Sequence, residues 1–476
     1  MTSDPAILLL AALAAAVLLG AVFAWLVRIA RHPLGAERTV ALLLGLLVLE
    51  TALYSDQSLI PVGLFHPEAG GLSFRLFDIL IPLALAARIA TGGRIRTVPV
   101  QALLWSAFLL WLACAAIQGL LIGNPGGLVA FHAKAIIYLG VFPLVAAVAP
   151  ERWVESPALR RVVVASSIAA AVLLITSQAH LALDVGLPLL PLSGFGPLGS
   201  DAASLFAVLG LGALIVGLCS DRGRLGAFAV AVPLLGAPLA AGQRAAMVGL
   251  AASFGLALAL LALRWQRIRV MPAEVGLCVL AAGALVCVLV LASLLGGGTE
   301  VRLPLQNEIQ QAFTSRGKQL SEQDRINQWR QVRDLIAEQP WTGWGLGKEY
   351  DYYSPGFFAF MRTDITHNIA FDLLLRTGIA GLLLFAAALA ASLRDALAVW
   401  FTALDARVAA IGLACGTALV GLFTKGMFES LLEKYRLAIL IGGLVGVSAS
   451  IALTRAAPAV EQVRNRRELR PGALAR

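Results

Sequence analysis

Charged residues are scarce in this chain of 476 residues. Asp, Glu, Lys and Arg make up 14% of it, whereas hydrophobic residues make up 59%, and the mean hydropathy is +0.83. A soluble domain cannot bury that much apolar surface, so we expect an all-α integral membrane protein with many spanning helices. A transmembrane β-barrel is excluded because the apolar runs approach about 20 residues and lack the short alternating segments of barrel strands.

Residues and motifs that would indicate a metal or nucleotide enzyme are also missing. The five cysteines lie in or at the ends of apolar runs, which indicates neither a disulfide framework nor a thiolate metal site. The chain has no Walker loop, dinucleotide-binding fingerprint, HExxH motif or Asp-x-Asp pair. We therefore expect no cofactor and no bound metal. The net charge of +9 is attributed to basic cytoplasmic loops, and no nucleic-acid partner is expected.

Thirteen apolar runs are candidate membrane spans. The short second, third and eighth runs are expected to be tilted or broken, because a helix needs about 20 residues to cross the hydrocarbon core. The first run is too long for a cleavable signal peptide and has no basic residue before it. In chain order the runs cover residues 7–29, 39–54, 76–90, 101–122, 128–149, 162–183, 202–219, 225–241, 245–263, 274–295, 366–392, 408–428 and 437–453.

The distribution of arginine predicts how these spans are oriented. Every odd-numbered span is followed by a basic segment, whereas the alternate short loops carry almost no positive charge. By the positive-inside rule the N-terminus faces outward and the C-terminus inward. The predicted organisation is spans 1–10 in residues 1–297, a large outward catalytic loop in 298–365, spans 11–13 in 366–454, and a basic, disordered cytoplasmic tail in 455–476 that lies near membrane lipids.

The outward loop contains a predicted amphipathic helix. Ser321 is expected to cap it and Pro340 to end it, and we expect its apolar face to lie on the membrane-embedded body. Arg325 falls at the edge of that face, one turn before Trp329, so its guanidinium can point toward the bundle. The alternative is a solvated arginine on the polar face. The apolar residues that recur at helical spacing are Ile326, Trp329, Val332 and Ile336.

Arg244 lies in a very short outward turn between the eighth and ninth runs, among small residues. An arginine next to hydrocarbon is costly unless it faces a polar cavity or an anion. Its planar guanidinium also matches phosphate oxygens in a bidentate manner. The alternative is an arginine that snorkels to the interface. The surrounding sequence is Ala240-Ala241-Gly242-Gln243-Arg244-Ala245-Ala246.

His367 lies at the outward start of the eleventh span, where Asp364 or Thr366 is expected to cap the helix. A helix N-terminus disfavours imidazolium, so the ring should stay neutral and able to accept a proton. The alternative is a structural histidine at the interface. Asp372 and Arg376 are expected to form an ion pair within the membrane. Three polar residues, spaced four apart, follow His367 along one face of this span: Asn368, Asp372 and Arg376.

Three further cations could line the same anion-binding cavity. Each could instead pair with a nearby acid, such as Asp78 or Glu429, and the sequence leaves both possibilities open. An outward-facing enzyme would not meet cytosolic ATP or nucleotide sugars, so its donor must be activated beforehand and delivered within the membrane. A lipid diphosphate meets that requirement. The three cations are Arg75, Lys134 and Lys425.

Four short motifs occur in a fixed order along roughly residues 200–450. They are Gly242-Gln243-Arg244, Asp324-Arg325-Ile326-Asn327-Gln328-Trp329, Pro340-x-x-Gly343-x-Gly345-x-Gly347, and His367-Asn368 ending in Gly378-x-x-Gly381. Together they resemble the O-antigen ligase and O-antigen polymerase superfamily. Arg376 departs from the pattern, because many members carry an acidic residue there. The thirteen spans also depart from the twelve, with both ends inside, that are common for ligases.

The resemblance implies a GT-C-like glycosyltransferase at the periplasmic face of the bacterial inner membrane. Its donor would be a glycan on polyprenyl (undecaprenyl) diphosphate, and its acceptor lipid A-core in lipopolysaccharide biosynthesis or a second lipid-linked glycan. Carried over, Arg244 and Arg325 would hold the diphosphate, and His367 would activate the acceptor hydroxyl or complete the phosphate site. The residues expected to contribute to substrate binding are Arg75, Lys134, Trp329, Asn368 and Lys425.

The expected reaction is a metal-independent, inverting glycosyl transfer, because two arginines can neutralise a diphosphate leaving group without a metal. O-antigen ligase activity is the first expectation. An O-antigen or exopolysaccharide polymerase and a protein O-oligosaccharyltransferase need the same donor chemistry and stay open. A lipid-linked glycan transporter is the alternative from another class, and it would require charged residues near the membrane midplane and repeated halves.

Overall fold

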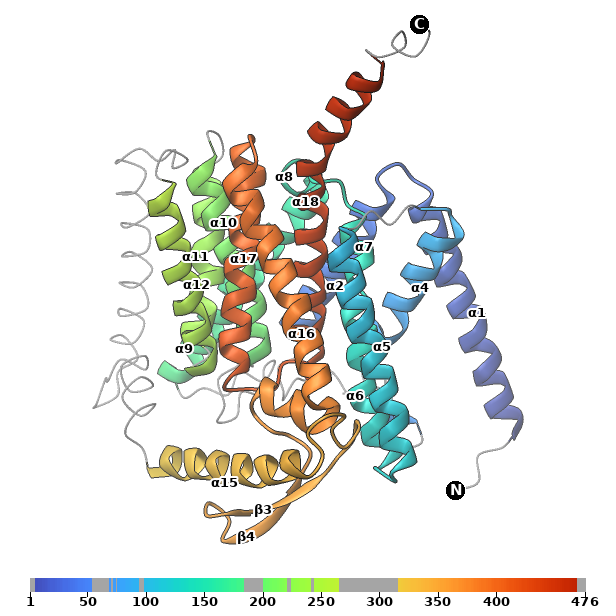
Figure 1. The fold of residues 1–476 in the computed structure, drawn as a ribbon, viewed down its shortest axis with the longest axis vertical. Helices are drawn as coiled ribbons and strands as arrows, with labels where there is room; N and C mark the ends of the chain where they lie inside the picture. The colour runs from blue at the N-terminus through green and yellow to red at the C-terminus, as the bar shows by residue number, and fades with distance from the viewer. Residues whose placement is uncertain are drawn as a thin grey trace, which may run out of the picture.

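The protein is a bundle of long α-helices with a small cap across one end (Figure 1). The computed structural model describes residues 5–53, 68–69, 72–73, 75–93, 98–183, 200–220, 224–240, 244–264 and 316–468. Helix α15 (Arg316–Glu338) lies across the lower ends of the bundle helices in Figure 1, and a β-hairpin lies below it. We call this end of the bundle the α15 end.

The bundle helices alternate in direction, so that segments far apart in the chain meet at the α15 end. The first part of the chain contributes α1 (Pro5–Ala30), α2 (Gly35–Leu53), the short strands β1 (Glu68–Ala69) and β2 (Leu72–Ser73), α4 (Leu76–Ala90), α5 (Pro99–Leu121), α6 (Gly126–Leu139), α7 (Phe142–Ala146), α8 (Arg152–Glu155), α9 (Pro157–Leu183), α10 (Ser200–Cys219), α11 (Arg224–Ala240) and α12 (Arg244–Leu263). After α15 follow β3 (Tyr350–Ser354), β4 (Ala359–Thr363), α16 (Ile369–Thr402), α17 (Ala406–Gly426) and α18 (Tyr435–Glu468).

Eight helices among the described residues are long and apolar enough to cross a membrane. A spanning helix satisfies its own backbone hydrogen bonds, which lipid cannot do. The predicted all-α polytopic fold is therefore confirmed. Twelve of the thirteen predicted runs coincide with a described helix, and the tenth, 274–295, lies outside the described residues. The eight occupy α5, α6 with α7, α9, α10, α12, α16, α17 and the first part of α18.

The cap consists of α15 and an antiparallel hairpin of β3 and β4. The predicted helix start at Ser321 is wrong, since α15 begins at Arg316, where Arg, Lys, Gln and Leu are good helix formers that extend it. Its end at Glu338, just before Pro340, is confirmed. The hairpin was not predicted, although its strands are rich in aromatic residues and Pro355-Gly356 is a turn signal between them.

The hairpin and α15 are joined by side chains on both. Ser354 donates from Oγ to Asp324 Oδ1 at 2.8 Å, and Asn327 Nδ2 donates to the carbonyl of Tyr353 at 3.0 Å. Beneath them, Val332 of α15 packs with Leu375 of α16 in a small apolar core. The expectation that this helix lies on the membrane-embedded body is confirmed for α16.

Helix α16 is broken near the α15 end. Gly378 has φ 67° and ψ −172°, which interrupts the helical hydrogen bonds around it. The segment 340–347, which we call the glycine loop, supplies the missing partners: Trp344 N donates to the Leu375 carbonyl at 2.7 Å, and Ile379 N donates to the Pro340 carbonyl at 2.8 Å. The break is tolerated because another stretch of backbone satisfies the freed groups.

Glycine is required where this loop approaches the helices. Gly343 has φ 68°, and a Cβ there would lie 2.7 Å from the backbone of α16 at Arg376 and Gly378. Gly347 has φ 82°, and its Cβ would lie 2.7 Å from the Val129 side chain on α6. Both positions therefore exclude other residues by conformation and by space.

Polar side chains at the ends of α5 and α6 fix the glycine loop in place. Gln118 Nε2 donates to the Gly343 carbonyl at 2.8 Å, and Asn124 Nδ2 donates to the Leu346 carbonyl at 2.8 Å. The Leu346 amide donates in turn to the Ala115 carbonyl of α5 at 2.9 Å. The loop thus connects α5 to the break in α16.

The end of the chain differs from the expectation. Residues 455–476 were expected to be disordered, but α18 continues as a helix to Glu468 and projects beyond the bundle at the end opposite α15 (Figure 1). The expectation is therefore wrong for 455–468, because Ala, Glu, Gln and Arg in this stretch favour the helix. Residues 469–476 lie outside the described residues.

Replacing Gly343 should destabilise the fold more than replacing a helical glycine with space around it. In Gly343→Ala the new Cβ meets α16 backbone in an unfavourable φ region, and we expect a loss of about 1–3 kcal/mol. Gly212→Ala is the matched control, because its Cβ would meet nothing within 4 Å and alanine favours a helix. Thermal unfolding in detergent should give a lower midpoint for Gly343→Ala alone. Equal midpoints would contradict the close approach.

Candidate functional site

Polar side chains gather at the α15 end, close to the turn that precedes α16. The turn comprises residues 364–368 and leads from β4 into the helix. The predicted caps, Asp364 and Thr366, are wrong. Asn368 caps α16, because its Oδ1 accepts from Ala370 N at 2.9 Å and from Phe371 N at 3.2 Å, and an asparagine can accept both while its backbone stays extended.

His367 precedes this cap in a strained conformation. Its φ is 51°, the left-handed region that non-glycine residues rarely occupy. The side chain is half-buried, and neither ring nitrogen has a hydrogen-bond partner among the described residues. Burial lowers the pKa of His367, and the charge of Arg325 lowers this pKa further. The ring is therefore neutral at pH 7 and free to accept a proton.

Arg325 lies on α15 at the edge of the helix that faces His367. Its side chain is half-buried and has no carboxylate partner among the described residues. Arg333, two turns later, is exposed and pairs with Asp334 at 2.8 Å. A buried cation is costly unless a negative charge compensates it. The charge of Arg325 is therefore not compensated by any carboxylate in the part of the chain that the structure describes.

The start of α12 brings Arg244 to the same end of the bundle. Helix α12 runs antiparallel to α17: Ser253 Oγ donates to the Thr417 carbonyl at 2.9 Å, and a Cβ on Gly249 would lie 3.1 Å from Lys425 Cβ. Arg244, one turn and a half before Gly249, therefore begins its helix at the α15 end. Its side chain lies outside the described part of the structure.

Two of the residues expected to bind substrate have their polar groups engaged within the protein. Trp329 Nε1 donates to the Thr366 carbonyl at 3.0 Å, and its ring lies 5.9 Å from that of Phe371. Asn368 is buried, and its Nδ2 donates to the Met427 carbonyl at 2.9 Å. Both residues fix the turn around His367, whatever contact they make with a substrate.

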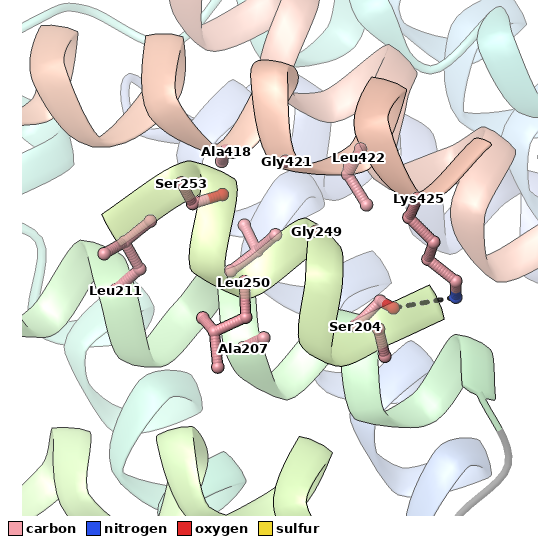
Figure 2. Close-up of a pocket in the computed structure, with 12 residues that line it drawn as sticks. Ser204, Ala207, Leu211, Gly249, Leu250, Ser253, Ala418, Gly421, Leu422 and Lys425 are labelled. Atoms are coloured by element: carbon pink, nitrogen blue, oxygen red, sulfur yellow. Dashed lines mark hydrogen bonds between the residues drawn. The ribbon is translucent and has the colours of Figure 1, made fainter. Parts of the chain in front are cut away.

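Two of the three further cations pair with acids. Lys134 Nζ lies 2.7 Å from Asp78 Oδ2. Lys425 Nζ lies 3.2 Å from Glu429 Oε2, and 2.8 Å from Ser204 Oγ, at the edge of a small apolar pocket between α10, α12 and α17 (Figure 2). Of the two possibilities that the sequence left open, pairing with an acid is thus observed for both lysines.

Arg75 differs from the two lysines. Its guanidinium carbon lies 3.9 Å from the centre of the Tyr435 ring, over the face of the aromatic system. Its backbone amide donates to Asp78 Oδ2 at 2.9 Å. Arg75 thus lies between the starts of α4 and α18, next to the Lys134–Asp78 pair.

A buried charged cluster lies beneath the turn. Arg376 Nη1 is 3.0 Å from Asp372 Oδ1, which confirms the predicted ion pair, and Arg376 also binds Glu433 from the segment before α18. His132 Nε2 lies 3.0 Å from Asp364 Oδ2, and its Nδ1 accepts from the Gly347 amide at 3.1 Å. The cluster thus ties the turn to α6, α16 and the glycine loop.

Glu433 was not among the residues predicted from the sequence. Its carboxylate is within reach of two members of the buried cluster, Arg376 and His132, the latter at 3.7 Å. An acid directly before the apolar run of α18 was the available signal, because an ionisable side chain at the edge of a membrane span must have a partner. The partner could not be identified without the fold, since 57 residues separate Glu433 from Arg376.

The surroundings of Asp364, in the turn before α16, keep its carboxylate ionised. Burial opposes ionisation of Asp364, but its contact with His132 and the charge of Arg376 hold its pKa below the ordinary range. Within the described ranges, no group of three or more His, Cys, Asp or Glu side chains is arranged to hold a metal ion. Among the described residues, the site thus combines Arg325, which has no carboxylate partner, with the neutral ring of His367.

This arrangement lies within a segment that matches a known family. Residues 229–386 match the family model for O-antigen ligase. The match covers 158 of the 476 residues, and this segment is therefore similar to the O-antigen ligase family. The similarity supports a membrane-bound, glycosyltransferase-like enzyme of the O-antigen ligase or polymerase type. No curated protein matches the chain.

The matched segment contains the three residues that were predicted to be catalytic. It runs from within α11 into α16, and so includes Arg244, Arg325 and His367. The fold brings Arg325 and His367 together at the α15 end. It places the backbone of Arg244 at the same end. Arg75, Lys134 and Lys425 lie outside the matched residues.

The pKa of His367 should respond to the charge of Arg325. We expect it to lie below the ordinary histidine value of about 6.5, and to rise in Arg325→Gln, since removing a nearby positive charge favours imidazolium. NMR titration of histidine-labelled protein in detergent measures this, with His367→Asn to assign the signal. Arg330→Gln, on an exposed position of α15, is the control and should leave the pKa unchanged. An identical pKa in wild type and Arg325→Gln would contradict the proximity.

Proposed function

We propose that this protein transfers a glycan from an undecaprenyl diphosphate carrier to a sugar hydroxyl at the periplasmic face of the bacterial inner membrane. The observation that carries the proposal is the placement of Arg325, without a carboxylate partner, beside the neutral ring of His367. The family match supports a lipid-linked glycan as the donor class. The arginine bias between the helices supports an outward α15 end.

The donor diphosphate is held by Arg244 and Arg325. Each guanidinium can bind two phosphate oxygens through parallel N–H donors, and two arginines can neutralise much of the charge of a diphosphate. Lys134 and Lys425 are less suited to this role, because each already lies next to a carboxylate. The polyprenyl chain extends from the diphosphate into the surrounding membrane.

His367 acts as the general base. Its neutral ring takes the proton of the acceptor hydroxyl as the oxygen attacks the anomeric carbon, and the bond from that carbon to the diphosphate oxygen breaks. The electron pair leaves with the diphosphate, where Arg244 and Arg325 stabilise the developing charge. Attack opposite the leaving group inverts the anomeric centre. No step in this sequence requires a metal.

The favoured acceptor is lipid A-core, which makes the protein an O-antigen ligase of lipopolysaccharide biosynthesis. A second lipid-linked glycan as acceptor would make it an O-antigen or exopolysaccharide polymerase, and a serine or threonine hydroxyl would make it a protein O-oligosaccharyltransferase. All three use the same donor site. They differ only in what occupies the side of His367 away from Arg325.

The test is glycan transfer by the purified protein in detergent with EDTA present. The donor is undecaprenyl-diphosphate glycan, offered with lipid A-core or with a second lipid-linked unit. We expect transfer to lipid A-core and a loss of at least about 100-fold in His367→Ala, Arg325→Ala and Arg244→Ala, as for removal of a general base or a charge-stabilising donor.

Arg333→Ala is the matched control, because Arg333 is an exposed arginine of the same helix that already pairs with Asp334. It should retain full activity. Product ladders without lipid A-core would identify a polymerase with the same site. Transfer at the wild-type rate by the folded His367→Ala and Arg325→Ala variants would overturn the mechanism, and no transfer to either acceptor would favour a transporter.

A further inference from the structure

Three successive backbone carbonyls lead into His367, and each accepts a hydrogen bond from a different element. Arg376 Nη2 of α16 donates to the Asp364 carbonyl at 2.6 Å. Tyr350 Oη of β3 donates to the Ile365 carbonyl at 2.6 Å, and Trp329 Nε1 of α15 donates to the Thr366 carbonyl at 3.0 Å. We call these three donors the carbonyl clamp. They come from positions 12, 15 and 37 residues away in the chain, so only the folded state assembles them.

The residue that follows the clamp is the one with unfavourable backbone geometry. His367 has φ 51°, which costs energy for a residue with a Cβ, and such a conformation persists only where the surroundings fix it. On its other side Asn368 is held by the α16 amides and by the Met427 carbonyl. The backbone is therefore fixed on both sides of His367, while the imidazole ring itself has no hydrogen-bond partner among the described residues.

We propose that Arg376, Tyr350 and Trp329 are positioning residues that hold His367 in its left-handed conformation and thereby present its ring beside Arg325. This rests on the proposed function, in which His367 is the base. In an extended or right-handed conformation the ring of His367 would point elsewhere, and the base would be displaced from the donor site. The clamp links the positions of α15, β3 and α16 to the geometry of a single side chain.

The three side chains of the carbonyl clamp can donate their hydrogen bonds permanently. Burial raises the pKa of Tyr350, so its hydroxyl keeps its proton and remains a donor. Arg376 is held by Asp372 and Glu433, which orient its guanidinium toward the turn. Trp329 can only donate from its indole nitrogen. None of the three needs to exchange a proton for the clamp to persist.

Tyr350→Phe is the sharpest test, because it removes one hydroxyl and leaves the ring packed against Val332 and Leu375. Tyr352→Phe, on the same strand, is the matched control. We expect kcat for glycan transfer to fall about tenfold in Tyr350→Phe, in keeping with the loss of one buried hydrogen bond, with KM changed less than twofold. In a His367→Ala background the same substitution should cause no further loss, because it acts through His367.

A second readout does not depend on catalysis. NMR titration of His367 should give a pKa closer to the ordinary value in Tyr350→Phe than in wild type or Tyr352→Phe, because a displaced ring leaves the burial and the charge of Arg325. Unchanged titration and unchanged kcat in Tyr350→Phe would overturn the proposal, as would an equal further loss in the His367→Ala background. If His367→Ala itself stays fully active, the proposed function fails, and the titration alone then decides whether the clamp positions the ring.

Discussion

The break in α16 at Gly378 leaves backbone groups without helical partners, and the glycine loop satisfies them. Because lipid offers no hydrogen bonds, a broken helix at the edge of the membrane must be completed by other backbone. The amide of Trp344 and the carbonyl of Pro340 do this, and the close approach requires Gly343. Since the glycine loop directly follows α15 and directly precedes β3, this pairing also fixes the cap. The positions of Arg325 and His367 therefore depend on a backbone interaction in which neither takes part.

The site is distinguished by an arginine, Arg325, for which the described residues provide no counter-charge. Lys134, Lys425 and Arg376 each lie within 3.2 Å of a carboxylate oxygen, so their charges are compensated inside the protein. Arg325 has no such partner among the described residues and lies beside a histidine kept neutral by burial. Anions bind where positive charge is uncompensated. The proposed diphosphate site follows from this contrast more than from the number of cations at the α15 end.

Much of the fold could be predicted from local patterns in the sequence. Apolar runs located twelve of the described helices, and helical spacing with Pro340 located α15 and its end. The i, i+4 spacing of Asp372 and Arg376 predicted the ion pair that the structure shows. These features depend on neighbours a few residues apart, which a sequence displays directly. The placement of His367 and Arg325 as candidates rested on motif order and on their positions at span edges.

Contacts between distant segments could not be obtained in the same way. Nothing local indicates that Glu433 reaches Arg376, that His132 meets Asp364, or that the Tyr350 hydroxyl binds the carbonyl of Ile365. The cap on α16 was assigned to the wrong residue, because Asn368 adopts the cap only once the preceding turn is fixed by those contacts. The left-handed conformation of His367 has the same origin.

The most direct test of the account is a structure of the protein with a non-transferable undecaprenyl-diphosphate sugar bound. We predict that the diphosphate oxygens lie within hydrogen-bond distance of the guanidinium groups of Arg244 and Arg325, and that the His367 ring faces the anomeric carbon. A diphosphate bound beside Arg75 and Lys134 instead, or with His367 turned away from the sugar, would contradict it.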